Sequence, residues 1–334
     1  MFDAYTYDVY RQIDLPRLIN QALRSTTMIT KEEIQQWFMG LQDTITTQIS
    51  ATDGVGTFIE DSWERHGGGG GRTRILTNGR ILAKAGVGFS AVYGQTPKKI
   101  LQALNLPEAD FFATGVSIVM HPNSPLVPII HMNVRYFEMT NGTCWFGGGI
   151  DLTPHYINPK DARWFHQQMK AACDAHDPTY YPKYKPWADD YFYIKHRQET
   201  RGIGGIFFDH LMPTVAADGS DNKAELFSFV QSVGNAFAPT YSHFMTKNHE
   251  LPYTEAHQKW QALRRGRYVE FNLVLDKGTK FGLDTDGRTE SILMSMPPMA
   301  QWVYDHKVEP ASAEEYTQQH LQKGIDWLTH PDAD

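Results

Sequence analysis

Residues 115–139 read GVSIVMHPNSPLVPIIHMNVRYFEM, and this stretch decides the fold class. Two segments rich in β-formers, 114–121 and 129–139, flank the connection PNSPLVP. Its three prolines cannot take part in a central hydrogen-bonded ladder, so the connection must be a loop. Asn141-Gly142 then predicts a second tight turn. Successive strands joined in this way indicate an antiparallel sheet.

Side chains alternate across a strand, so each of the two segments has a polar and an apolar side. Ser117, Val119 and His121 share one face, and the second segment presents its polar residues on one face as well: His131, Asn133, Arg135 and Phe137. The opposite sides are apolar, as expected for a face that packs on helices. We interpret the polar face as a pocket, because Ser, His, Asn and Arg among prolines and aromatics differ from ordinary Lys/Glu surface decoration. The alternative is a solvated sheet face.

Glycine-containing turns extend the sheet on both sides of this stretch. Asn78-Gly79 predicts a type I′ hairpin over 72–92. Gly67–Gly71 fits neither the dinucleotide fingerprint nor the phosphate loop and is interpreted as a flexible loop. The glycines 147–149 are also expected to be flexible, which would let backbone approach a ligand beside Asp151.

Helix signals occur on both sides of the β-rich part without regular strand–helix alternation. Thr30 and Glu33 form a capping box before the first apolar stripe, and Asn158-Pro159 is a helix start. We expect helices over 31–49, from 159, over 185–200 and 223–244, and from Ser312 to about Leu328, with a strand over 267–275. The prediction is a single α+β domain spanning 1–334.

Composition excludes several classes of protein. The 334 residues include 31 basic and 38 acidic side chains, a net charge of −7, and 41% are hydrophobic, which is enough for a sizeable core. The acidic balance argues against nucleic-acid and anionic-membrane binding. Two cysteines without CxxC spacing indicate a reducing compartment. With no leader in MFDAYTYDVYRQIDL and no apolar run of about 20 residues, we expect a cytoplasmic protein.

Four strings carry a specific resemblance: GVSIVMHPNSPLVPIIHMNVRYFEM, WFGGGIDLTPHY, YYPKYKPWADDYFYIKHRQETRGIGGIFFD and YVEFNLVLDKGTKFGL followed by TESILMSMPP. In this order they closely resemble oxygen-dependent coproporphyrinogen-III oxidase, over about 57–298. The resemblance implies a large, rather flat antiparallel sheet covered by helices on both faces, and a homodimer. It implies oxidative decarboxylation of coproporphyrinogen III to protoporphyrinogen IX in heme biosynthesis, with O₂ as co-substrate and no organic cofactor.

The resemblance also assigns substrate contacts. It places Ser117, Asn133, Val134 and Arg135 at the tetrapyrrole, with a second contact group of Asp286, Gly287 and Arg288. Guanidinium groups suit the four carboxylates of this substrate. The alternatives are a structural ion pair for Arg135 and a surface turn for 286–288. Arg201 is interpreted as a helix cap rather than a propionate contact.

Catalytic roles and a metal are implied in the same way. An aspartate matching Asp151 contacts pyrrole N–H groups, and His131 matches a proton donor, while Arg135 is counted with them as catalytic. The alternative for Asp151 is an N-cap. His121, His131, His166 and His196 match histidines assigned as ligands of a divalent metal, although their sequence separations form no local metal motif; the alternative is hydrogen-bonded pocket histidines.

Two rival functions belong to other classes. A metal-dependent hydrolase would use the His and Asp residues to activate water and would need no oxygen. A non-catalytic tetrapyrrole-binding protein would keep the arginines and the apolar cleft but would not need Asp151.

Overall fold

The computed structural model describes residues 29–96, 108–284 and 287–333. The N-terminal stretch examined for a leader and Asp286 lie outside these ranges. In chain order the elements are α2 Lys31–Asp53, β1 Ile59–Glu64, β2 Gly69–Thr77, β3 Leu82–Gln95, β4 Asp110–Pro122, β5 Ile129–Met139, β6 Cys144–Thr153, α4 Pro159–Asp174, α5 Tyr180–Tyr191, β7 Tyr193–Ile194, β8 Glu199–Thr200, β9 Gly205–Leu211, α6 Lys223–Asn248, α7 Glu255–Glu270, a π-helical segment Phe271–Leu275, α8 Lys277–Asp284, α9 Thr289–Leu293, α10 Ala313–Gln319 and a 3₁₀ turn Pro331–Ala333.

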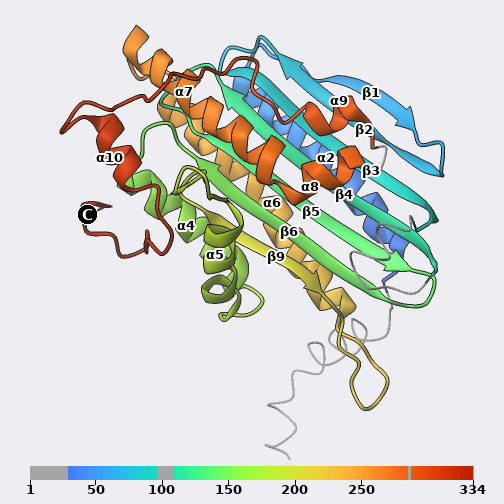
Figure 1. Ribbon diagram of the computed structural model, residues 1–334. Helices are drawn as coiled ribbons and strands as arrows, with labels where there is room; N and C mark the ends of the chain where they lie inside the picture. The colour runs from blue at the N-terminus through green and yellow to red at the C-terminus, as the bar shows by residue number, and fades with distance from the viewer. Residues whose placement is uncertain (1–28, 97–107, 285–286, 334) are drawn as a thin grey trace, which may run out of the picture.

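One open sheet organises these elements. Its strand order is β1-β2-β3-β4-β5-β6-β9, and every neighbouring pair is antiparallel. Figure 1 shows α7, α8 and α9 in front of this sheet and α2 and α6 behind it. The predicted class, an antiparallel α+β sheet with helices on both faces, is confirmed. We keep the single-domain organisation as a prediction.

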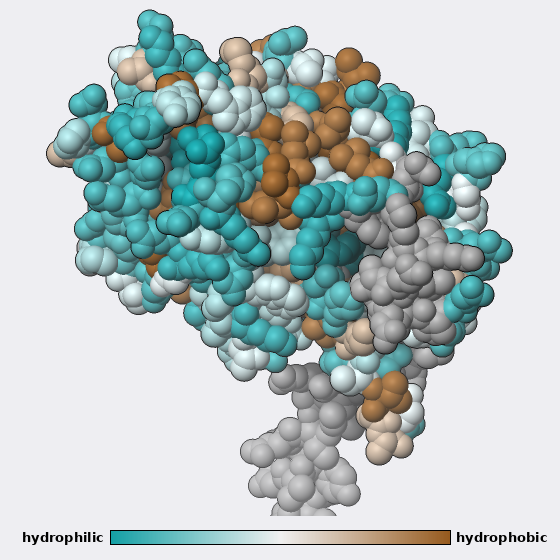
Figure 2. Space-filling model, in the orientation of Figure 1, coloured by the Kyte–Doolittle hydropathy of each residue, from teal (hydrophilic) through white to brown (hydrophobic). Residues whose placement is uncertain are grey.

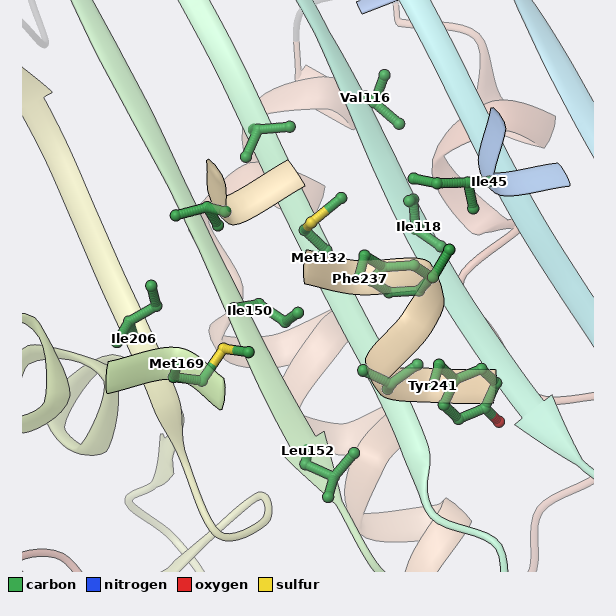
Figure 3. Close-up of a cluster of buried hydrophobic side chains, with 14 of the residues drawn as sticks. Ile45, Val116, Ile118, Met132, Ile150, Leu152, Met169, Ile206, Phe237 and Tyr241 are labelled. Carbon is green, nitrogen blue, oxygen red and sulfur yellow. The ribbon is translucent and has the colours of Figure 1, made fainter. Parts of the chain in front are cut away.

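The rear face of the sheet carries the main hydrophobic core. Val87, Ile118, Met132, Ile150 and Ile206 stand opposite one another on five successive strands, and all are fully buried. Ile45 of α2 and Phe237 and Tyr241 of α6 cover this row, as Figure 3 shows. The apolar alternation of β4 and β5 therefore exists because this side of each strand packs on helices.

The front face places the predicted polar residues in neighbouring rows. One row crosses all seven strands in register: Asp61, Thr73, Gly88, Ser117, Asn133, Gly149 and Phe207. The row beside it contains Val119, His131, Asp151 and Gly205, and the row on the other side contains Gly115, Arg135 and Gly147. Ser117, His131, Asn133 and Arg135 are half-buried, so this strip remains accessible between the helices.

Most residues of two glycine runs expected to be flexible lie in strands, although Gly67 and Gly68 form a turn as expected. Gly69–Gly71 pair with β3, Gly70 and Gly71 also pair with β1, and a Cβ at Gly70 would lie 2.2 Å from the carbonyl oxygen of Trp63. Glycine is needed there because the neighbouring backbone approaches closely. Residues 147–149 lie inside β6 and are buried. At the predicted hairpin only Asn78 has a positive φ, and residues 78–81 form a four-residue connection instead of a type I′ turn.

The first helix begins at the predicted capping box, where Thr30 and Glu33 exchange both hydrogen bonds, and Asn158 caps α4 as predicted. The predicted extents of two other helices are wrong. The helix expected over 185–200 spans 180–191 and is followed by the β7–β8 hairpin. The helix that begins after Ser312 ends at Gln319.

The strand expected over 267–275 is the end of α7 and the π-helical segment. This region also repeats buried residues at helical spacing, with Trp260, Arg264, Tyr268 and Phe271 all nearly solvent-inaccessible. These residues form a helix and not a strand because tertiary contacts favour the helical spacing of the buried residues over the alternating pattern.

Candidate active site

The strongest polar arrangement on the front face joins Asp151, His131 and Arg201. Nδ1–H of His131 donates to Oδ1 of Asp151 at 2.8 Å. Nη2 of Arg201 donates to the same oxygen at 2.7 Å, and its Nε donates to Oδ2 at 3.2 Å. Asp151 sits opposite His131 in the sheet register, so the first contact follows from strand pairing, and the second comes from the loop after β8.

Arg201 is held in an aromatic enclosure. Its guanidinium carbon lies 4.4–4.8 Å from the ring centroids of Phe192, Tyr268 and Phe271, and Nη1 donates to Oδ1 of Asn272 at 3.0 Å. The side chain is only 2% exposed. The interpretation of Arg201 as a helix cap is therefore wrong, because α5 ends at Tyr191 and the guanidinium pairs with a buried carboxylate.

Electrostatics keep Asp151 ionised. Burial alone raises the pKa of this carboxyl, but the charge of Arg201 and the hydrogen bonds from His131 and Arg201 lower it further than burial raises it. An ionised carboxylate only accepts hydrogen bonds, so Nδ1 of His131 carries a proton and Nε2 lies on the opposite side of the ring. The imidazole is thus held in one tautomer, with Nε2 available on the half-buried side of the residue.

Asn133 and Arg135 form a second polar group on β5, two and four residues after His131. Nη1 of Arg135 donates to Oδ1 of Asn133 at 2.7 Å, and Nη2 pairs with Oδ1 of Asp209 at 2.8 Å. The guanidinium lies close to Gly147, where a Cβ would come within 2.8 Å of its central carbon. Gly147 is therefore required for this position of Arg135, and Ser117 lies directly opposite Asn133 in the register.

Val134 does not belong to this polar group by its side chain. It is fully buried on the rear face, between the residues that point forward, because side chains alternate along β5. The side chain of Val134 therefore cannot contact a substrate on the front face.

The second predicted contact group lies near the β1 edge. Arg288 pairs with Asp61 of β1, and its Nη1 is buried without a hydrogen-bond partner. Nearby, Thr73 and Ser291 share a hydrogen bond of 2.7 Å, which fixes α9 on β2. Gly287 donates its N–H to the carbonyl of Gly282, so its backbone closes a turn. Four inter-strand steps of about 4.8 Å separate Asp61 from Asn133, roughly 19 Å in all.

The four histidines expected to share a metal are not brought together. His121 contacts the carbonyl of Ser295, His131 contacts Asp151, and His196 contacts Glu270 on the surface. Both ring nitrogens of His166 are hydrogen-bonded, to the Tyr181 hydroxyl and the Ile203 carbonyl, and burial lowers its pKa to about 3. Within the described residues the only group of three ligand atoms close enough to share a cation excludes all four. The arrangement does not fit the implied ligand set.

The site can transfer a proton and bind carboxylates, and the sequence predicted only some of the residues involved. An ionised carboxylate and an imidazole of fixed tautomer can move a proton at a stated nitrogen, and the guanidinium groups of Arg135 and Arg288 can hold carboxylates. Sequence reasoning missed Asp209, and it missed the pairing of Arg201. The alternation of β9 could have indicated that Asp209 points forward, but no local signal indicates the partner of Arg201.

Comparisons with known proteins agree on one family. The family model described as coproporphyrinogen III oxidase matches residues 33–327. The chain is 46% identical over 312 residues to the oxygen-dependent coproporphyrinogen-III oxidase of Parasynechococcus marenigrum strain WH8102, covering 87% of this chain and 85% of the relative. It is 45% identical over 321 residues to that of Synechococcus sp. strain CC9605, covering 90% and 88%. A chloroplastic counterpart from Glycine max is 45% identical over 313 residues, covering 89% and 79%.

Proposed function

The chain belongs to the oxygen-dependent coproporphyrinogen-III oxidase family, and we propose that the front face of its sheet is where the family reaction takes place. The enzyme is an oxidoreductase that uses O₂ in porphyrin biosynthesis. It converts coproporphyrinogen III to protoporphyrinogen IX by oxidative decarboxylation. For each propionate, R–CH₂CH₂–COO⁻, O₂ and H⁺ give R–CH=CH₂, CO₂ and H₂O₂, so the two electrons that reduce O₂ come from the propionate.

The substrate is a tetrapyrrole with carboxylates around its rim, and the front face offers matching groups. Arg135 and Arg288 lie toward opposite sides of the polar strip, each half-buried and each paired with an acidic residue. A propionate can replace Asp209 or Asp61 in these pairs because guanidinium–carboxylate geometry is the same in both. Ser117 and Asn133 lie between the two arginines on the row that crosses the sheet.

Exposed apolar side chains of the front-face helices suit the macrocycle itself. Leu273, Val274 and Leu283 are between 42% and 50% exposed, although each belongs to a helix that covers the front face. Figure 2 shows the brown surface in this part of the molecule, beside strongly hydrophilic neighbours. Ligand sites of this kind combine apolar walls with a few placed polar groups.

The single observation that carries the proposed mechanism is the Arg201–Asp151–His131 arrangement. A peroxide formed on a pyrrole ring can take a proton from the propionate β-carbon, after which CO₂ leaves and the vinyl group forms. The balance needs one further proton for each propionate, and we assign its delivery to Nε2 of His131, which must take up a proton before this step. Asp151 holds the imidazole in place by accepting the hydrogen bond from Nδ1, as a carboxylate does in other acid–base dyads.

Direct contact between Asp151 and pyrrole N–H groups, which the resemblance implies, stays a prediction. The carboxylate already accepts three hydrogen bonds and is 1% exposed, so one lone-pair position on Oδ2 remains for it. We therefore assign the contact with the substrate to His131 and a positioning role to Asp151 and Arg201.

Three further predictions concern the cofactor, the membrane and the location of the enzyme. The route above requires no organic cofactor, which an absorption spectrum of the purified chain tests. No helix among the described residues is long and apolar enough to cross a membrane. The cytoplasmic location stays a prediction.

We also propose a homodimer. The family resemblance implies that the segment 222–275 contributes the dimer contact. Phe227, Phe229 and Phe237 of this segment are buried in the core, so these three cannot be contact residues. Leu251 and Tyr253 of the same segment are exposed and can contribute. Sedimentation velocity measures the assembly state.

Turnover of coproporphyrinogen III by the purified chain, with and without O₂ and with and without prior chelation, tests the whole proposal. Product formed only with O₂ and retained after chelation would support it. Activity without O₂ that needs a divalent ion would favour a hydrolase. Tight binding with no product under any condition would favour a tetrapyrrole-binding protein.

A further inference from the structure

The C-terminal part of the chain holds a cluster of metal-ligating side chains far from the reaction. One ligand atom from each of His320, His330 and Asp332 lies within 4.8 Å of the other two. His320 follows α10, and Asp332 lies in the 3₁₀ turn at 331–333. Figure 1 shows α10 and the end of the chain beyond α4, outside the sheet. None of these residues takes part in the proposed mechanism.

Each side chain in the cluster is oriented by a neighbour. Nδ1–H of His320 donates to the carbonyl oxygen of Tyr316 at 2.7 Å, which leaves the lone pair of Nε2 available. The hydroxyl of Tyr316 donates to Oδ2 of Asp332 at 2.8 Å. Metal-binding imidazoles and carboxylates are usually held by outer hydrogen bonds of these two kinds.

His330 adds an independent observation. Its Nδ1 is buried and has no hydrogen-bond partner. The ring itself is held in place, because it stacks on Trp327 and its backbone carbonyl accepts from Arg163 of α4 at 2.7 Å. Leaving a buried polar atom unpaired costs free energy, and a bound cation would remove that cost.

We propose that His320, His330 and Asp332 bind a divalent transition-metal cation of the zinc type. Two imidazoles and one carboxylate are a common three-residue ligand set for Zn²⁺, with water in the fourth position. Ligand atoms at about 2.1 Å from a tetrahedral ion are roughly 3.4 Å apart, so the widest gap must close by at most about 1.4 Å. Rotation of the half-buried His320 and exposed Asp332 side chains would bring their ligand atoms toward the His330 ring, which stays in place.

The bound ion fastens the C-terminal segment to the body of the protein. Beside the cluster, the carbonyl of Leu321 accepts from the N–H of Thr200, and the carbonyl of Ile325 accepts from Nζ of Lys185. The ion would close the loop from His320 to Asp332, on which both contacts depend. Its role is therefore in stability, and its effect is read from metal binding and from unfolding.

Calorimetric titration of the metal-free full-length chain with ZnCl₂ tests the site. We expect a first equivalent that binds at least ten-fold more tightly than any later one, and this phase is lost in His320→Ala and His330→Ala. His306→Ala removes an exposed histidine outside the cluster and should keep it. At one hundred times the dissociation constant, Zn²⁺ should raise the unfolding temperature by about 5 °C.

A tight first phase that persists in both variants, or a wild-type chain that binds no more tightly than they do, would overturn the proposal. If His330→Ala fails to fold, Asp332→Asn decides, because Asp332 is exposed and its amide keeps the shape of the carboxylate. Co²⁺ gives a second readout, since its tetrahedral visible absorption should appear in wild type and disappear in Asp332→Asn. None of these readouts depends on turnover of coproporphyrinogen III.

Discussion

Replacing Asp151 with Asn removes one negative charge from a site with almost no solvent. Asn has the same shape as Asp, so packing is kept, but the guanidinium of Arg201 loses the carboxylate with which it is paired while it stays 2% exposed. The new amide NH₂ also faces a donor, either Arg201 or His131. Both effects destabilise the folded state, because a buried charge needs a partner of opposite sign.

The size of the effect follows from this burial. Removing one partner of a buried ion pair costs about 3–5 kcal/mol in the free energy of unfolding. At about 2 °C for each kcal/mol in a chain of this length, the unfolding temperature should fall by roughly 6–10 °C. Asp43→Asn provides a matched control, since Asp43 pairs with Arg72 and Arg74 but is half-exposed. That pair should be worth less than about 1 kcal/mol.

Differential scanning calorimetry of wild type, Asp151→Asn, Arg201→Met, Asp43→Asn and the double variant Asp151→Asn/Arg201→Met measures the effect. The double variant should lose less stability than the two single changes added together, because it removes both members of the pair. An Asp151→Asn variant that unfolds within about 2 °C of the Asp43→Asn control would refute the electrostatic reasoning.

Three further changes have distinct expected outcomes. Arg135→Ala should lose both substrate binding and turnover. Asp151→Ala should lose turnover by about 100-fold or more with little change in substrate binding. Separate measurements of affinity and rate would distinguish the two variants. Asp53→Ala should cost about 3 kcal/mol in chemical denaturation, because this buried carboxylate accepts from five backbone N–H groups; an unchanged midpoint would contradict this. For Glu270, burial raises the pKa but hydrogen bonds, above all from an arginine, lower it further, to about 2. Since the folded pKa lies below the unfolded value of about 4.3, its contribution to stability is present above pH 4.3 and is lost as the pH falls toward 2, so Glu270→Gln should flatten acid unfolding in this range.

Local periodicity was sufficient to predict the centre of the fold. The period of two along β4 and β5 assigns Ser117, His131, Asn133 and Arg135 to one face without any knowledge of the third dimension. The bounds of β5 and the capping box at Thr30 and Glu33 were predicted for the same reason, since both depend on residues within a few positions of each other.

Contacts between distant segments could not be predicted from local pattern. Arg201 meets Asp151 across fifty residues, and the path of the chain after β8 decides that meeting. The segment 267–275 satisfied both an alternating and a helical pattern, and only its burial against Arg201 and the strands favours the helix. A family resemblance grouped four histidines that the fold keeps with separate partners.

The glycines of the front face have a consequence for how this enzyme can change. Gly115, Gly147 and Gly149 leave the middle strands with little apolar area on that side, so the free energy of folding comes mainly from the rear face. Selection for folding and selection for substrate therefore act on alternate residues of the same strands. The half-buried front-face side chains Ser117, Asn133 and Arg135 can change, or be redesigned for a differently substituted macrocycle, while packing against α2 and α6 is preserved.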